Sequence, residues 1–169
     1  MKTYSQFVSE SVATDGGLYT FRKPSLHSIE LLSEWMQENH IPNPVSAAEL
    51  HVSVICSEIP VPGYIPDSNS VWVNPTTYSV GMLGEALVLK FRSEVLSQQW
   101  KEAQNLGAQS RWPTFQPHLS LSYAVPLDYD YSNIKPMFVQ LVFMEEQCRQ
   151  MIDGWASVNP LVSYTAETQ

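Results

Sequence analysis

Two short segments of this chain share one pattern, a histidine and a serine separated by a single apolar residue. Residues 50–54 read LHVSV and residues 117–121 read PHLSL. In a β-strand, successive side chains point to opposite faces, so each segment places its His and Ser on one face and apolar residues on the other. The pattern therefore predicts a sheet with one buried face and one face that carries two imidazoles and two hydroxyls.

These four side chains suit general acid–base chemistry. An imidazole titrates at about pH 6.5, so His51 and His118 can act as base and acid in one site near neutral pH. Ser53 and Ser120 can donate hydrogen bonds to phosphate oxygens on which negative charge accumulates. We interpret the four as catalytic residues for phosphoester cleavage. The alternative is that the two histidines lie on exposed strands and share no function.

No metal or other cofactor is expected. Each motif supplies one histidine ligand, and a metal site needs three or more. His27 and His40 lack the His-x-Ser pattern and are expected on the surface of a helix. Cys56 and Cys148 show no disulfide or zinc spacing and are expected as reduced thiols.

The order of the expected elements indicates an α+β fold of two similar lobes. Residues 1–15 read as an N-terminal arm, and residues 16–169 as a single bilobal domain. Alternating or apolar runs predict strands, and apolar stripes at helical spacing predict helices. Strands are expected at 18–23, 50–56, 78–83, 86–91, 118–123 and 138–146, and helices at 25–39 and 93–106.

The charge balance narrows the choice of ligand. The chain has 9 Lys plus Arg against 17 Asp plus Glu, a net charge of -8. Binding along a long nucleic acid requires many basic side chains, so such a partner is excluded, whereas a small anion held by a few groups is not. No apolar run reaches the roughly 18 residues of a membrane span, and the N-terminus lacks a secretory apolar region. An intracellular protein without a membrane partner is expected.

The two motifs, 67 residues apart in a chain of this size, resemble those of the 2H phosphoesterase superfamily. The resemblance covers residues 17–150 and implies a bilobal α+β fold. That fold has two antiparallel sheets, helices outside and a central cleft where the motifs meet. Serine stands in both motifs where threonine is common in the family. The activity implied is metal-independent phosphodiester hydrolysis.

Within that superfamily, the chain is most similar to the phage anti-CBASS enzymes, which degrade cyclic di- and trinucleotide immune signals. The similarity rests on the Gly17-Leu18-Tyr19 segment before the first motif and on Trp155 after the second. Residues 1–10 also resemble the N-terminus of some phage proteins packaged in the head. The resemblance implies action in the cytoplasm of the infected bacterium, with packaging in the phage head as a further option.

Five residues are candidates for binding a cyclic oligonucleotide. Tyr19, Trp72 and Trp155 offer rings on which bases can stack, and Glu145 or Glu146 can accept hydrogen bonds from a guanine edge. Core packing is the alternative for Tyr19 and Trp72. A C-terminal packing anchor is the alternative for Trp155, and a solvated strand end for the two glutamates.

Three further features have candidate roles near the cleft. Arg22 or Lys23 can offset phosphate charge, but the two point to opposite faces of a strand, so at most one can reach the cleft. Trp112 can line the approach to the second motif. The proline-rich loop 59–70 is either a lid or an ordered surface loop.

The sequence thus predicts a phosphodiesterase that cleaves 3′-5′ linkages of cyclic di- or trinucleotides, with no obligate protein partner. Alternatives are an RNA-end 2′,3′-cyclic phosphodiesterase, a protein that binds cyclic nucleotides without cleaving them, and a structural phage protein.

Overall fold

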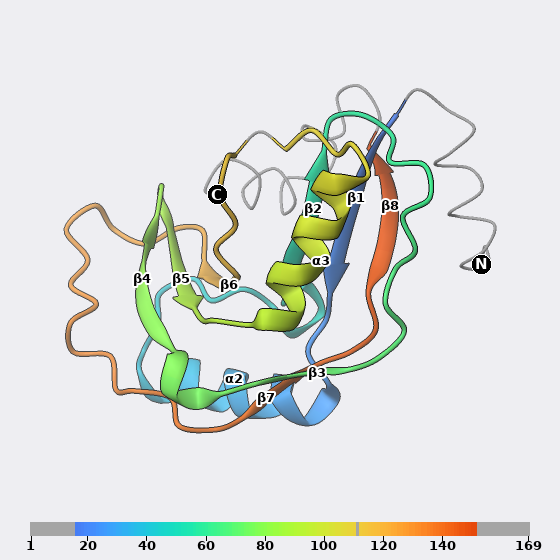
Figure 1. The fold of residues 1–169 in the computed structure, drawn as a ribbon. Coiled ribbons are helices and arrows are strands. Elements are labelled where there is room, and N and C mark those ends of the chain that lie inside the picture. The colour runs from blue at the N-terminus through green and yellow to red at the C-terminus, as the bar shows by residue number, and fades with distance from the viewer. Residues whose placement is uncertain (1–15, 111, 152–169) are drawn as a thin grey trace.

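The computed structural model describes residues 16–110 and 112–151, so the expected arm 1–15 lies outside the described residues. The described chain is α+β, as expected, with two antiparallel sheets and two α-helices (Figure 1). The strands are β1 (Gly17–Arg22), β2 (Val52–Ser57), β3 (Val71–Val73), β4 (Ser79–Leu83), β5 (Ala86–Lys90), β6 (His118–Ser122), β7 (Leu141–Phe143) and β8 (Gln147–Met151). The helices are α2 (Leu26–Glu38) and α3 (Glu94–Asn105), with 3₁₀ segments at Ala47–Glu49 and Pro75–Thr77.

The larger sheet joins two groups of three strands. Its order is β4-β5-β6-β2-β1-β8, and all pairs are antiparallel. The groups β8-β1-β2 and β6-β5-β4 meet where Val52 of β2 pairs with Leu119 of β6. β3 and β7 form the smaller sheet. In Figure 1, α3 lies over β1 and β2, while α2 lies beside β3 and β7.

The core fills the space between α3, α2 and one face of the larger sheet. It contains the apolar sides of both motif strands, including Val52, Val54, Leu119 and Leu121. The polar sides of those strands therefore face away from this core. No described helix combines the length and apolar character needed to cross a membrane.

Both helices begin at the serine that the sequence indicated. Ser25 accepts a hydrogen bond from the Ser28 amide at 3.2 Å, and Ser93 accepts one from the Leu96 amide at the same distance. Such caps satisfy an amide that has no partner within the helix. His27 and His40, expected on the surface, are both exposed.

The apolar spacing of α3 predicts a buried stripe of Val95, Leu96, Trp100, Ala103 and Leu106, but the observed stripe is narrower. Leu96, Gln99 and Ala103 are buried, whereas Val95 is 48% exposed and Leu106 is 46% exposed. Val95 lies about 100° around the helix from Leu96, and Leu106 lies beyond the last helical residue. The expectation that both are buried was wrong.

Of the strand expected at 138–146, only Leu141–Phe143 forms a strand, β7. The following strand, β8, begins at Gln147, beyond the expected range, and was not predicted. β7 belongs to the smaller sheet, and β8 to the larger one. The break falls at Met144–Glu146, where the Met144 amide donates to the Lys23 carbonyl at 2.8 Å and Glu146 turns into the core. Pattern alone missed this because a carboxylate is rarely found inside a core unless it is paired.

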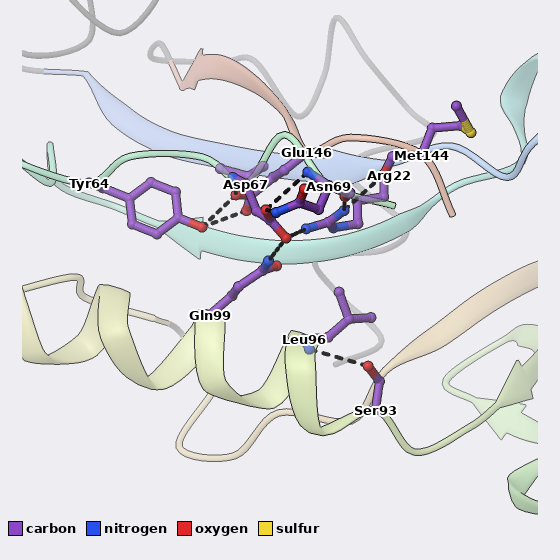
Figure 2. Close-up of polar contacts among 10 residues, drawn as sticks. Arg22, Tyr64, Asp67, Asn69, Ser93, Leu96, Gln99, Met144 and Glu146 are labelled. Atoms are coloured by element: carbon purple, nitrogen blue, oxygen red, sulfur yellow. Dashed lines mark hydrogen bonds and ion pairs between the residues drawn. The ribbon is translucent and has the colours of Figure 1, made fainter. Parts of the chain in front are cut away.

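A buried arginine holds several loops against the sheet. Arg22 is completely buried, and its guanidinium donates to the carbonyls of Asn69 and Met144 at 2.6 and 2.9 Å. It also forms an ion pair with Asp67 at 2.7 Å (Figure 2). Gln99 of α3 donates to the same Asp67 oxygen at 2.9 Å. One side chain of β1 thus links the loop before β3, the chain before β8 and, through Asp67, α3.

Glu146 completes this network. Its carboxylate accepts hydrogen bonds from the Thr20 hydroxyl at 2.7 Å, the Tyr64 hydroxyl at 2.6 Å and the Asp67 amide at 3.0 Å. The contacts of Tyr64 and Asp67 anchor the proline-rich loop 59–70 to the sheet. These contacts favour the ordered surface loop over the lid.

We predict that Arg22→Ala lowers the free energy of unfolding by about 3 kcal/mol, because it leaves a carboxylate and two carbonyls without their donor. Urea unfolding followed by circular dichroism measures this change. Lys101→Ala, an exposed charge on α3, is the control and should shift stability by no more than about 0.5 kcal/mol. Equal midpoints for the two variants would show that the arginine network does not stabilise the fold.

Candidate active site

The structure brings the two His-x-Ser motifs together on one face of the larger sheet. Because Val52 pairs with Leu119 in an antiparallel ladder, His51 lies opposite Ser120, and Ser53 lies opposite His118. Val52 and Leu119 are completely buried on the core side, so the alternating histidines and serines lie on the other face. We call this face of the sheet the motif face.

Both imidazoles are held by the same type of hydrogen bond. His51 Nδ1 lies 2.7 Å from the Glu49 carbonyl oxygen, and His118 Nδ1 lies 2.9 Å from that of Gln116. A carbonyl only accepts, so in each ring Nδ1 carries the proton and Nε2 has a lone pair. His118 Nε2 is buried and has no hydrogen-bond partner among the described residues. Each histidine is therefore fixed in the tautomer that can accept a proton at Nε2.

Burial keeps both imidazoles neutral. His51 is 7% exposed and His118 is 2% exposed. Burial lowers the pKa of His51 to about 4, and the Glu49 hydrogen bond opposes this shift. Lys23, Arg149 and any charge on His118 act in the same direction as burial. Burial also lowers the pKa of His118, helped by Lys90 and opposed by the bond to Gln116. A bound anion would offset this cost by stabilising the imidazolium form.

Tyr19 lies beside the first motif but is not an open stacking surface. Its ring is 1% exposed, and its hydroxyl lies 2.7 Å from the Ser53 Oγ. Burial raises the pKa of Tyr19, so its phenol stays neutral and keeps its proton. The ring stacks on Phe21 at 5.4 Å between centroids, and Trp112 packs against this pair. Tyr19 thus orients Ser53, and the expected base-stacking role does not fit this geometry.

Two further candidates lie away from the motif face. Glu146 is 1% exposed and its carboxylate is already occupied by the network of the core, so it cannot read a base edge here. Trp72 lies on β3, a strand of the smaller sheet that is not among those expected from the sequence, where it pairs with Val142 and is 66% exposed. Neither joins the histidines. A three-residue strand such as β3 leaves too short a pattern to detect.

The remaining candidates are not brought to the motifs by the described contacts. Glu145 is exposed between β7 and β8. Trp155 lies outside the described residues. Arg22 is buried in the core, so Lys23 is the member of the Arg22/Lys23 pair nearer to His51, and its Nζ donates to the Ala48 carbonyl at 3.0 Å. This agrees with the expectation that at most one of the two reaches the site.

Two side chains near the motifs were missed. Phe21 of β1 meets His51 edge to face at 6.0 Å between ring centroids. Arg149 of β8 places its guanidinium carbon 5.1 Å from the centre of the Phe21 ring. No local pattern could have identified either residue, because both depend on strand pairing between distant segments. Among the described residues, no three His, Cys, Asp or Glu side chains lie together as a metal site would need.

Solved phosphoesterase structures share this fold. A crystal structure described as a phosphoesterase superposes with a TM-score of 0.54 at 15% sequence identity, covering 82% of this chain and 99% of the other. E. coli LigT in its apo form superposes with a TM-score of 0.54 at 16% identity, covering 81% of this chain and 88% of LigT. The expected 2H phosphoesterase fold is confirmed.

Sequence comparison identifies a narrower family. The family model for the anti-CBASS protein Acb1 matches residues 16–158. The Acb1 protein of Enterobacteria phage T4 is 35% identical over 121 residues, which is 67% of this chain and 76% of the relative. The Acb1 protein of Escherichia phage RB16 is 26% identical over 161 residues, covering 89% and 88% of the two chains. This chain therefore belongs to the Acb1 family of anti-CBASS proteins.

Proposed function

We propose that this protein is a phosphodiesterase that cleaves the 3′-5′ linkages of cyclic di- and trinucleotides without a metal ion. The observation that carries the proposal is the facing pair of buried His-x-Ser motifs, in which both imidazoles hold the tautomer with a lone pair on Nε2. Family membership supplies the biological setting. The protein would act in the cytoplasm of an infected bacterium and remove the signal that activates CBASS immunity.

The first step is transfer within the substrate. One imidazole Nε2 takes the proton of a ribose 2′-hydroxyl, and the 2′-oxygen attacks the adjacent phosphorus. The bond from phosphorus to the 5′-oxygen breaks, and the other histidine, protonated at Nε2, donates its proton to that oxygen. The product is a linear oligonucleotide with a 5′-hydroxyl and a 2′,3′-cyclic phosphate. The ring is opened at this step.

The second step restores both histidines to their starting protonation states. The histidine that gave up its proton now accepts one from water, and the resulting oxygen nucleophile attacks the cyclic phosphate. The other histidine protonates the leaving ribose oxygen. Ser53 and Ser120 donate hydrogen bonds to the non-bridging oxygens in both steps. Tyr19 supports this by fixing the Ser53 hydroxyl.

We predict that His51→Ala and His118→Ala each lower kcat on a cyclic dinucleotide by about 10²- to 10⁴-fold, because each removes one proton-transfer group. Chromatography and mass spectrometry of the products, with excess chelator present, measure this loss. His27→Ala removes an exposed histidine of α2 and is the matched control, expected to retain wild-type rates.

Four results would contradict the proposal. Wild-type rates in either motif variant would exclude the acid–base pair, and loss of wild-type activity in chelator would exclude the metal-free mechanism. Return of intact cyclic dinucleotide after denaturing the wild-type complex would indicate a binding protein. Turnover restricted to RNA ending in a 2′,3′-cyclic phosphate would indicate an RNA-end phosphodiesterase.

We also predict different pH optima for kcat/KM and kcat. The profile of kcat/KM reports the pKa values of the free enzyme, and burial lowers those of both histidines below the usual value of about 6.5. Its optimum should therefore lie on the acid side of neutrality. Bound phosphate stabilises the imidazolium and raises its pKa, so the kcat optimum should lie at higher pH.

Steady-state rates between pH 4.5 and 8.5 test this order of optima. The two optima should differ by at least about half a pH unit. Each unit of pKa shift corresponds to about 1.4 kcal/mol of interaction between the imidazolium and the bound phosphate. Coincident optima, or an optimum of kcat/KM above that of kcat, would show that substrate binding does not restore the charge of the histidines.

A further inference from the structure

The larger sheet differs in charge from the rest of this acidic protein. None of its six strands contains Asp or Glu, although the chain has 17 such residues. The strands do contain Arg22, Lys90 and Arg149. Arg22 faces the core, whereas Lys90 lies opposite His118, and Arg149 lies over Phe21 on the motif face. The histidines therefore lie between two cations and beside no strand carboxylate.

Of these two cations, Arg149 is the better placed to contact a ligand. The side chain of Lys90 extends toward the edge strand β4, away from the histidines. Its Nζ lies 3.4 Å from the position that a Cβ on Gly81 of β4 would occupy. Arg149 instead leans inward from the opposite edge strand β8. It lies across the pair from Tyr19 and reaches diagonally over Phe21, whose ring meets His51.

The guanidinium of Arg149 has N–H donors that a ligand can use. The residue is exposed, and among the described residues no Asp or Glu forms an ion pair with it. The contact with Phe21 is a cation–π contact, and the guanidinium has five N–H donors. That fork of donors matches the oxygens of a phosphate group.

We propose that Arg149 binds a phosphate of the substrate other than the one that is cleaved. This inference rests on the proposed function, in which the scissile phosphate lies between His51 and His118. It makes Arg149 a residue that selects substrates with two or more phosphodiesters over those with one.

The spacing of the strands supports this division of roles. β8 lies two strands from β2, which corresponds to about 10 Å at the usual strand separation. A ligand that reaches both the histidines and Arg149 must span Phe21 with a second anionic group. A cyclic di- or trinucleotide has such a group, whereas a 2′,3′-cyclic mononucleotide has a single phosphate and cannot occupy both positions.

Arg149 could also affect catalysis indirectly, through the effect of its charge on His51. Its positive charge also lowers the pKa of His51, so its removal can alter catalysis without any direct contact to substrate. An effect through His51 would change the hydrolysis of every substrate. An effect through a second phosphate would change only substrates that have one.

The test compares Arg149→Gln with the wild type on a 3′-5′ cyclic dinucleotide and on a 2′,3′-cyclic mononucleotide. For the dinucleotide, KM should rise at least about tenfold, as expected for loss of a charged hydrogen bond, and should depend less on ionic strength. For the mononucleotide, KM and kcat should change less than about twofold. Arg149→Lys keeps the positive charge but not the forked arrangement of donors. Its KM for the dinucleotide should lie between those of the wild type and Arg149→Gln.

Lys101→Gln is the matched control, because it removes one exposed positive charge from α3, on the opposite side of the sheet. Its KM and kcat on both substrates should match those of the wild type. Equal losses on both substrates in Arg149→Gln, or no loss on the dinucleotide, would overturn the inference.

A binding experiment keeps the result independent of turnover. Calorimetry with the cyclic dinucleotide compares His118→Ala with His118→Ala/Arg149→Gln, and the second protein should bind at least about tenfold more weakly. Equal dissociation constants, or no binding to the first protein, would contradict the role of Arg149. If the two variants bind with the expected difference but the wild type does not cleave the cyclic dinucleotide, the proposed function fails while the binding of a second phosphate by Arg149 stands.

Discussion

The pairing of Val52 with Leu119 is the contact on which the site depends. It joins the two halves of the sheet, and both residues are fully buried beneath the motif face. Because neighbouring strands lie about 4.8 Å apart, this pairing brings two motifs 67 residues apart in sequence to adjacent positions. A shift by one residue would turn one histidine into the core, so the apolar side of each motif fixes the geometry of its polar side.

Burial then gives these histidines a property that exposed ones would lack. Their charged forms are disfavoured, so the free protein holds two neutral imidazoles with lone pairs at Nε2. In the proposed mechanism, such a site has no protonated histidine to act as general acid until an anionic substrate binds. Binding a phosphodiester between the rings lowers the cost of protonating one of them. In the proposed mechanism, substrate recognition and the supply of the catalytic proton are therefore linked by one electrostatic interaction.

The sequence predicted the features that local periodicity determines. The faces of both motif strands, the first residue of each helix and the β4–β5 hairpin all follow from residues close together in the chain. Features that depend on distant partners were not predicted. Glu146 reads as a strand end, yet Thr20, Tyr64 and Asp67 bury it. These partners come from three different parts of the chain, so no window around Glu146 indicates its role.

The same limit explains why the acidic composition was only a partial guide. A net charge of -8 describes the whole surface, whereas a ligand responds to the few charges within about a Debye length, roughly 8–10 Å. On the motif face the strands contribute Lys90 and Arg149 and no carboxylate. A long nucleic acid extends beyond this face and meets the acidic remainder. A compact cyclic oligonucleotide does not, so an acidic chain can bind the small anion and still repel the large one.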